Sequence, residues 1–414
     1  MKIAVIDGFS TGRLLVSELR RRGVDCVHVQ TSRDIPEYFL RGFRPSDYSD
    51  RLDGEIDPTI LAHRLAELRV DRVVAGAESG VILADTLTHL MGLPGNRHET
   101  LAARRNKQLM AETAAAAGIA VPRGRTFGNA DDARAWFISN GLTEAVVKPL
   151  SSAVTDNVRF CCSADDVHHA CKAVLSSNNV FGQPNTAVLV QERVHGVEYY
   201  ANTVSYDGVH RVAELWRYSK RAGSTGSPVY DYEEPVPVHA EETAPLRSFV
   251  VAVLDALGVV CGAAHTEVMM TERGPVLIET GARLGGGTAP DVVQRYSGIS
   301  QTSLLADMLT VSDGLLDFDD DAVTWSGRLR NVALINMAAG HVRSLDWAER
   351  LRALPTLVHL TCGVGPGSYL PETIDLASSP GYVYLTSEDS CDVQRDYEVL
   401  RAMETEGLYT AYTA

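Results

Sequence analysis

The feature that most constrains this chain is the alternation of short apolar segments with helix-like segments over its first 95 residues. Apolar runs at 2–6, 24–29 and 72–75 have the length and composition of buried strands. Helical spacing or a glycine turn follows each of them. Because parallel strands need a crossover connection, this alternation predicts a doubly wound α/β domain. The loop from Gly8 to Gly12 lacks a full dinucleotide-binding glycine pattern, so we interpret it as a tight turn.

The rest of the chain mixes helical and extended patterns. We predict one helix over 100–117, a hairpin across Asp207-Gly208, and a long loop over 219–238, where Gly, Ser and Pro interrupt the periodicity. After an acidic run at 317–321, interpreted as a solvated linker, the pattern becomes β-rich. These changes divide the chain into four predicted parts: 1–95, 96–190, 191–312 and 313–414.

Composition narrows the class of protein. The net charge of −15 argues against a general nucleic-acid binder and against a surface held to anionic lipid. The seven cysteines show neither zinc spacing nor a disulfide framework, and no run of about 20 apolar residues predicts a membrane span. We therefore expect a cytoplasmic protein without nucleic-acid or membrane partners. Only five of the 38 basic residues are lysines, which draws attention to where those lysines lie.

A pair of acidic residues flanks a tight turn in the segment HTEVMMTERGPVLIETGARLGGG, residues 265–287. Glu267 and Glu279 lie at similar distances from the turn, so a hairpin would bring both carboxylates to one face of a sheet. Such like charges repel, and a divalent cation relieves the repulsion; oxygen ligands favour Mg²⁺ held together with nucleotide phosphates. Arg283 suits a carboxylate or phosphoryl group, and Gly286 and Gly287 let the backbone approach a ligand. The alternative is an exposed hairpin with solvated charges.

Taken in order, these motifs resemble the ATP-grasp enzymes. Lys107 lies in a helical segment, and Val147-Lys148-Pro149 ends a strand before a polar loop. The segment Val190–Tyr199 resembles the family's hinge, and the two-carboxylate hairpin with its trailing arginine and glycines comes last. The resemblance covers residues 1–312. It implies an α/β (α+β) ATP-grasp fold with a doubly wound N-terminal domain, a central lid subdomain, and a large subdomain continued by the β-rich C-terminal part.

The resemblance also implies roles, position by position. Lys107, Lys148 and the loop that begins at Ser151 and Ser152 match the groups that contact nucleotide phosphates. Glu267 and Glu279 match the Mg²⁺ ligands, and Arg283 the catalytic residue that stabilises the acyl-phosphate. The residues that match the adenine and ribose contacts are Gln191, Glu192, Val194 and Glu198.

Two positions depart from the family pattern. Gly281 stands where a metal-binding asparagine often occurs two residues after the second glutamate, which predicts more water around one metal. The phosphate loop, residues 151–157, contains no glycine, so backbone N–H groups and hydroxyls are expected to hold the phosphates instead.

Three residues keep two interpretations each. Lys220 is either a catalytic cation on a mobile loop that closes over the γ-phosphate or a solvated loop lysine. His265 faces the same side as Glu267 and either contacts substrate or is structural. Glu78 follows a strand end and either holds a substrate amine or is an acid at a helix start.

The resemblance is strongest to bacterial L-amino-acid ligases, which implies a ligase that uses ATP and Mg²⁺. It would join an amino acid carboxylate to an amine, such as another amino acid, through an acyl-phosphate, in specialised metabolism and as a homodimer. The alternatives are a carboxylating or purine-pathway enzyme of the same family, or a protein that binds ATP without turnover. We find no biotin-carrier segment in the sequence, which argues against a biotin-linked carboxylase.

Overall fold

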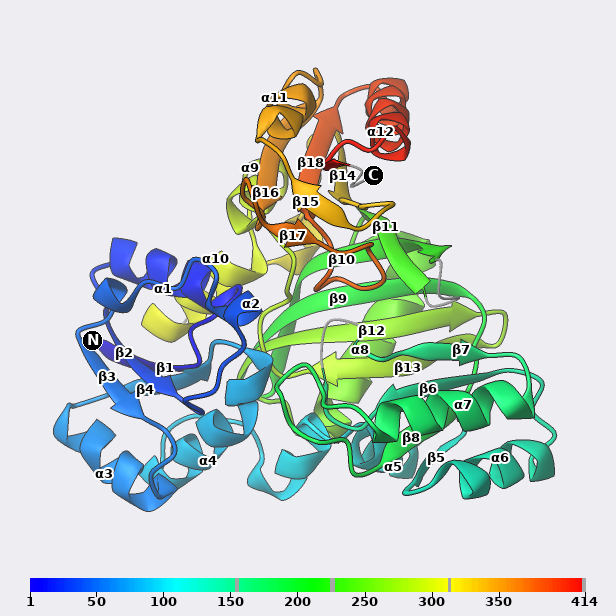
Figure 1. Ribbon diagram of the computed structural model, residues 1–414. Coiled ribbons are helices and arrows are strands. Elements are labelled where there is room, and N and C mark those ends of the chain that lie inside the picture. Colours follow the sequence, from blue (N-terminus) through cyan, green and yellow to red (C-terminus); the bar gives the residue numbers. More distant parts are fainter. Residues whose placement is uncertain (153–155, 224–227, 312–313, 412–414) are drawn as a thin grey trace.

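The computed structural model describes residues 1–152, 156–223, 228–311 and 314–411. Figure 1 shows three lobes around a common centre: an N-terminal lobe, a second lobe formed by residues near 124–192, and a third that contains the C-terminal helices. A long eight-stranded sheet runs between the second and third lobes. No helix in the described ranges is long and apolar enough to cross a membrane.

The N-terminal lobe is built on a parallel sheet of order β3-β2-β1-β4. Side chains of β1 are buried on both faces, as its continuous apolar run predicts. The helices pack on the two faces, which confirms the predicted doubly wound arrangement. Its elements are β1 (Lys2–Ile6), α1 (Gly12–Arg21), β2 (Asp25–Gln30), α2 (Glu37–Leu40), β3 (Asp50–Asp53), α3 (Pro58–Glu67), β4 (Arg72–Ala75) and α4 (Val81–Met91).

The second lobe is a four-stranded antiparallel sheet of order β5-β8-β6-β7, covered by two helices. Its elements are β5 (Gly124–Phe127), α6 (Ala130–Ser139), β6 (Ala145–Pro149), β7 (Arg159–Cys161), α7 (Ala164–Leu175) and β8 (Val188–Glu192).

The single helix predicted over 100–117 is wrong. A 3-10 helix, His98–Arg104, precedes α5 (Lys107–Ala116). The break occurs because the Asn106 side chain accepts hydrogen bonds from the backbone N–H groups of Gln108 and Leu109, which starts a new helix. Lys107 is therefore the first residue of α5.

The large sheet has the order β13-β12-β9-β10-β11-β14-β18-β16, and all neighbouring strands are antiparallel. Helices α8 (Ala244–Ala256), α9 (Pro290–Ser297) and α10 (Gln301–Thr310) accompany it. Its strands are β9 (Val197–Tyr206), β10 (Val209–Ala222), β11 (Pro228–Pro235), β12 (Gly262–Thr271), β13 (Gly274–Gly281), β14 (Arg328–Ala333), β16 (Leu357–Cys362) and β18 (Gly381–Ser387).

The long loop predicted over 219–238 is also wrong. Strand β10 continues to Ala222 and β11 begins at Pro228. The two prolines of β11 lie at its ends, where a missing N–H is tolerated, and the aromatic residues Tyr230 and Tyr232 favour a strand.

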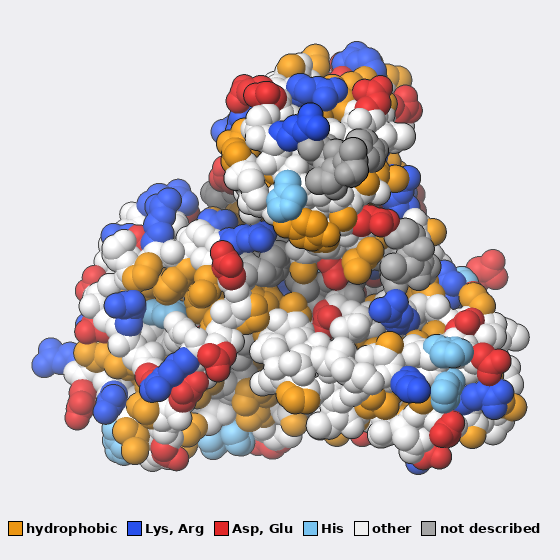
Figure 2. Space-filling view, viewed as in Figure 1, with side chains coloured by type: hydrophobic (Ala, Val, Ile, Leu, Met, Phe, Trp, Pro, Cys, Tyr) orange, Lys and Arg blue, Asp and Glu red, His pale blue; other side chains and the backbone are white. Residues whose placement is uncertain are grey.

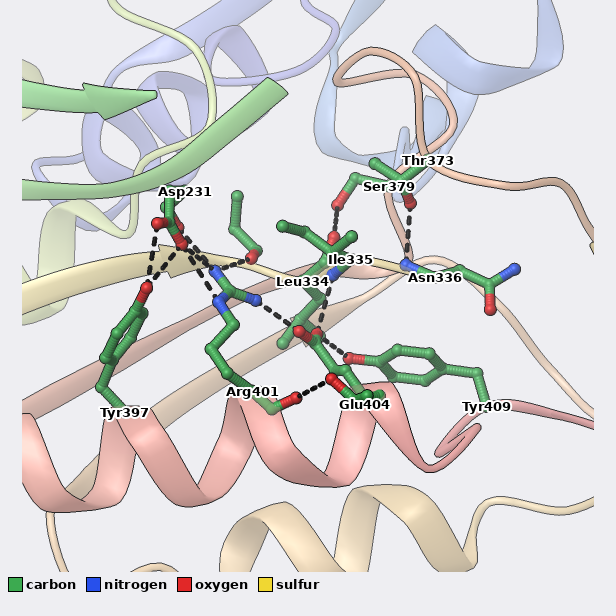
Figure 3. A network of polar contacts seen from close by, with 12 residues as sticks. Asp231, Leu334, Ile335, Asn336, Thr373, Ser379, Tyr397, Arg401, Glu404 and Tyr409 are labelled. Atoms are coloured by element: carbon green, nitrogen blue, oxygen red, sulfur yellow. Dashed lines mark hydrogen bonds and ion pairs between the residues drawn. The ribbon is translucent and has the colours of Figure 1, made fainter. Parts of the chain in front are cut away.

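The C-terminal residues extend the large sheet, because β14, β18 and β16 form its far edge. Helices α11 (Asp346–Arg352) and α12 (Ser390–Thr405) cover this edge, beside a small sheet of β15 (Gly340–Val342), β17 (Tyr369–Leu370) and β19 (Thr410–Ala411). Figure 3 shows the polar contacts that hold α12 against the large sheet. Arg401 donates hydrogen bonds to Asp231 of β11 and to Glu404, and Glu404 also accepts a hydrogen bond from the Tyr409 hydroxyl.

The acidic run at 317–321 is more than a solvated linker. Its Asp320 accepts a hydrogen bond from the backbone of Val212, and Asp321 pairs with Arg247 of α8. These contacts anchor the run against the large sheet and α8.

Candidate active site

A cavity of about 1040 Å³ lies where the three lobes meet. Residues of the N-terminal lobe, the second lobe, the large sheet and the C-terminal part all line it. Basic and acidic side chains are interspersed over all three lobes on the face shown in Figure 2, and do not gather into one basic surface. The concave, mixed polar and apolar lining is typical of a small-molecule site.

The two-carboxylate hairpin lies in this cavity. Glu267 of β12 pairs directly with Glu279 of β13. Their similar distances from the turn predicted that they would lie close together, and a β-bulge between Glu267 and Val268 brings them into direct register. Lys107 Nζ lies 2.5 Å from Glu279 Oε1, which compensates one of the two charges. Burial opposes ionisation of Glu267, but the hydrogen bond with His265 and the charge of Lys220 hold its pKa below the ordinary range. The hairpin therefore presents two carboxylates on directly paired residues, a suitable oxygen donor set for Mg²⁺.

Lys148 faces the cavity from the end of β6 and is only 7% exposed. Burial and the neighbouring Lys107 lower its pKa to about 8. Its ammonium forms neither an ion pair nor a hydrogen bond with the part of the chain that the structure describes. A buried cation in this state is suited to an anionic ligand that enters the cavity.

The structure places Lys220 on a strand, which contradicts the mobile-loop interpretation. Lys220 lies on β10, and its Nζ is 2.6 Å from Glu198 Oε1 and 4.6 Å from the ring centre of Tyr230. Although burial opposes it, Tyr230 and Glu198 hold the pKa of Lys220 above its ordinary range. Lys220 is thus a fixed cation in the cavity wall, and the solvated-lysine alternative is wrong as well.

Glu78 connects the N-terminal lobe to the segment that follows the two-carboxylate hairpin. Its Oε2 accepts a hydrogen bond from Arg283 Nε at 2.8 Å, and its Oε1 accepts one from Arg105 at 2.5 Å. Burial opposes ionisation, but the two guanidinium groups override it and hold the pKa of Glu78 at about 2. Because two cations already neutralise this carboxylate, the structure gives little support to Glu78 as the site of a substrate amine.

The residues that match the hinge line the cavity where β8 of the second lobe ends. Gln191 is buried on β8, and the partly exposed Glu192 side chain accepts a hydrogen bond from Arg123 Nε at 2.7 Å. Val194 follows in the segment that leads to β9.

The first part of the phosphate loop is described, and residues 153–155 lie outside the described residues. Ser151 accepts a hydrogen bond from Arg105 at 3.1 Å. Ser152 is buried and donates to Asp156 at 2.6 Å. The loop is therefore tied at both sides of the undescribed residues, and Arg105 links it to Glu78.

His265 and the glycines that follow the hairpin also lie at the cavity. His265 Nδ1 is 2.8 Å from Asn202 Oδ1, and its Nε2 is 3.6 Å from Glu267. These contacts support a structural role for His265, although the residue also lines the cavity. Gly287 has φ +67°, a left-handed conformation that favours glycine, and a side chain at Gly286 would meet only open space.

Sequence reasoning missed four residues that line the cavity, Tyr218, Tyr230, Glu233 and Asn331. It also missed two residues that contact lining residues, Arg105 beside Glu78 and Tyr200 beside Glu233. Arg105 precedes Lys107 by two residues and could have been suspected from that position. The others lie on β9, β10, β11 and β14, where the predicted loop hid the strand pairing that brings them together.

This combination of a three-lobed α/β fold, a shared cavity, two paired carboxylates and converging cations defines a ligase of the ATP-grasp class. The family model described as an ATP-grasp domain matches residues 142–291. Dapdiamide A synthase of Enterobacter agglomerans is 33% identical over 414 residues, spanning 98% of this chain and 96% of that protein. The chain therefore belongs to the ATP-grasp family, and it is an enzyme that forms C–N bonds.

Solved structures agree on the fold. The L-amino acid ligase from Bacillus licheniformis superposes with a TM-score of 0.75 at 18% identity and covers 97% of both chains. The carboxyaminoimidazole ribonucleotide synthase from Aspergillus clavatus, complexed with ATP, has a TM-score of 0.71 at 13% identity and covers 98% of both chains. At these identities the likeness establishes the shared architecture.

Proposed function

We propose that this enzyme joins the carboxylate of one amino acid to the amine of another, with conversion of ATP to ADP and phosphate. The full-length similarity to dapdiamide A synthase supports this proposal most strongly. The cavity supports it independently, because about 1040 Å³ accommodates a nucleotide together with small substrates.

The residues of the cavity fit ATP and Mg²⁺. Lys148 is a buried cation that lacks an anionic partner among the described side chains, and Lys107 lies beside it. Glu267 and Glu279 supply hard oxygen donors on adjacent strands. We infer that Lys107, Lys148, Ser151 and Ser152 hold the phosphates, and that adenine and ribose are contacted by Gln191, Glu192, Val194 and Glu198.

In the first step, an oxygen of the donor carboxylate attacks the γ-phosphorus, and the bond to the bridging oxygen breaks. The products are an acyl-phosphate and ADP. Lys107 and Lys148 compensate the phosphate charge, and Arg283, oriented by Glu78, stabilises the acyl-phosphate. Bound Mg²⁺, held by Glu267 and Glu279, would supply charge neutralisation at the phosphates.

In the second step, the acceptor amine attacks the acyl carbon. The C–N bond forms, the C–O bond to phosphate breaks, and the amine loses a proton. We infer that Arg283 stabilises the oxyanion of the tetrahedral centre, and its contacts with Glu78 and the Leu284 carbonyl support this role by fixing the guanidinium. Gly286 and Gly287 leave room for a substrate beside this arginine.

The proposal also covers the location, the oligomeric state, the metabolic role and the domain division of the protein. We infer a cytoplasmic location, which agrees with all seven cysteines being free thiols. A homodimer and a place in specialised metabolism follow from the resemblance to L-amino-acid ligases. The division into parts at residues 95, 190 and 312 likewise stays a proposal.

The test is incubation of the protein with ATP, Mg²⁺ and mixtures of L-amino acids, with ADP release measured and products identified by mass spectrometry. We expect ADP release that depends on amino acids, and a product mass equal to two amino acids less one water. ADP release driven by bicarbonate or by a ribonucleotide, without amide formation, would contradict the proposal.

A further inference from the structure

Glu233 lines the cavity, and no step of the proposed mechanism uses this acid. Glu233 of β11 pairs directly with Asn331 of β14 and with Tyr218 of β10. Strand β12, which carries Glu267, lies three strands from β11, because β10 and β9 stand between them. At about 4.8 Å between neighbouring strands, β11 and β12 are roughly 14 Å apart across the sheet, which is the scale of a small substrate.

The two carboxylates are linked by crossing tyrosines. Tyr200, which pairs directly with Glu267, donates its hydroxyl to Glu233 Oε2 at 2.7 Å. Tyr218, which pairs directly with Glu233, donates its hydroxyl to Glu267 Oε1 at 3.3 Å. Glu233 therefore lies in the same group of polar side chains as the two-carboxylate hairpin, but it contacts neither Glu267 nor Glu279 directly.

The contacts of Glu233 leave one oxygen open. Tyr200 and Asn331 both donate to Oε2, while Oε1 accepts no hydrogen bond from any described residue. Both partners are neutral, and both hold the carboxylate in one orientation. Burial raises the pKa of Glu233 to about 7, the mark of a carboxylate that lacks a counter-charge.

The other acids of the cavity are satisfied. Glu78 is bound by two arginines, Glu192 by Arg123, Glu198 by Lys220, and Glu279 by Lys107. Glu267 contacts His265 and belongs to the metal hairpin.

Asp156 has no basic partner among the described residues either, but both of its oxygens accept hydrogen bonds, from Ser152, Asn157 and the Val180 backbone. Lys220 acts on Glu233 through space only, since its ammonium is bound to Glu198.

We propose that Glu233, oriented by Tyr200 and Asn331, binds an ammonium group of a substrate amino acid through Oε1. The inference rests on the proposed function and identifies a specificity-determining residue for it. An ammonium supplies both the missing positive charge and the missing hydrogen-bond donor, and a charge-assisted bond of this kind is stronger than one between neutral groups. A carboxylic acid without an amine would leave the buried carboxylate unpaired, so the site disfavours such a substrate.

The test uses the full-length enzyme with ATP and Mg²⁺, and compares wild type with Glu233→Gln. Hydroxylamine replaces the acceptor in one arm, because it traps the acyl-phosphate as a hydroxamate and so reports on the donor alone. Each of the twenty proteinogenic L-amino acids is tried as donor, together with its des-amino carboxylic acid. The second arm measures the KM of the acceptor amino acid during amide formation.

If Glu233 binds the donor ammonium, Glu233→Gln should raise the donor KM about tenfold or more with kcat little changed. It should also reduce the preference for amino acid over des-amino acid by about the same factor, a change that a merely structural role would not produce. If the acceptor KM rises instead, with hydroxamate kinetics unchanged, the ammonium is that of the acceptor. Wild-type values for both KM and for the des-amino preference would overturn the inference.

Glu234→Gln is the matched control. Its side chain is paired with Arg217 and Arg330, and does not line the cavity, so both KM values should stay at the wild-type level. Removing an unpaired buried charge should not impair folding, and Glu233→Met repeats the test should the glutamine variant fail to fold. Absence of ligation by wild type would overturn the proposed function together with this inference, whereas wild-type ligation with an unaffected variant overturns the inference alone.

Discussion

Arg283 Nε donates a hydrogen bond of 2.8 Å to Oε2 of Glu78, a residue 205 positions earlier in the chain. This contact connects the N-terminal lobe to the segment that follows the two-carboxylate hairpin. Arg105 binds the other oxygen of the same carboxylate and also donates to Ser151. Glu78 is therefore a positioning residue, whose charge fixes two arginines at the place where phosphate and acyl groups would meet.

We predict that Glu78→Gln lowers kcat by about 100-fold, because an arginine displaced by even 1 Å stabilises the transition state poorly. The KM for ATP should change little, since Lys107 and Lys148 are untouched. ADP release measured under saturating ATP and amino acids checks both values. Glu99→Gln, at an exposed acid, serves as the control. A variant with normal kcat and a raised KM for ATP would contradict the positioning role.

Glu279→Gln should abolish turnover. The substitution keeps the side-chain shape but removes one of the two negative charges that would hold Mg²⁺, and it weakens the contact with Lys107. The measurement is amide formation, with Mg²⁺ binding followed by calorimetry in the presence of ADP. Glu272→Gln, at an exposed acid in the turn of the same hairpin, should leave both unchanged. Wild-type rates in Glu279→Gln would remove the metal assignment.

The hairpin shows what local sequence can predict. Similar spacing from a tight turn predicts that Glu267 and Glu279 come close together on paired strands. Their direct pairing also depends on a β-bulge between Glu267 and Val268, which the sequence did not indicate. The alternation of apolar strands and helices in the N-terminal lobe is equally local. Helix boundaries were less predictable, because the Asn106 cap divides a segment in which most residues favour helix.

Contacts between distant segments could not be predicted in this way. Glu78, Arg105 and Arg283 meet only because the lobes pack around one cavity, and no periodicity in the chain encodes that packing. Glu233 and Asn331 were hidden for another reason. The Gly, Ser and Pro residues near 222–228 indicated a loop and masked the pairing of β10 with β11, and hence of β11 with β14.

Lys148→Met should stabilise the ligand-free protein and weaken ATP binding. The pKa of Lys148 is about 8 in the folded protein against 10.5 for an ordinary lysine. A lowered lysine pKa means that the charged form costs folding free energy below about pH 8, and this cost corresponds to about 3 kcal/mol. The unfolded state binds more protons between pH 8 and 10.5, so this contribution makes wild-type stability rise with pH in that window.

Urea denaturation without nucleotide provides the measurement for Lys148. At pH 7 the variant should exceed wild type by up to about 3 kcal/mol, and the difference should shrink above pH 8. Lys172→Met, at an exposed lysine of α7, should show no such difference. A destabilised Lys148→Met would mean that the ammonium is already well compensated in the ligand-free cavity.

Replacing Lys220 distinguishes two interpretations of this residue, a fixed structural cation and part of a mobile lid. Its ammonium is bound to Glu198 and lies over the rings of Tyr218 and Tyr230, at 4.8 and 4.6 Å from the ring centres. Lys220→Met should therefore leave Glu198 unpaired in the cavity wall and reduce the free energy of unfolding by about 3 kcal/mol or more, as measured by urea denaturation without nucleotide. Adding Glu198→Gln should restore much of that stability, because the double variant contains no unpaired charge.

Arg221→Met controls for loss of a basic side chain at the next position of β10, where the residue is exposed. Its stability should stay within about 0.5 kcal/mol of wild type. A lid would behave in the opposite way, because it acts only during turnover. Full stability in Lys220→Met together with a large loss of kcat would therefore favour the lid and contradict the fixed position of Lys220 in the sheet.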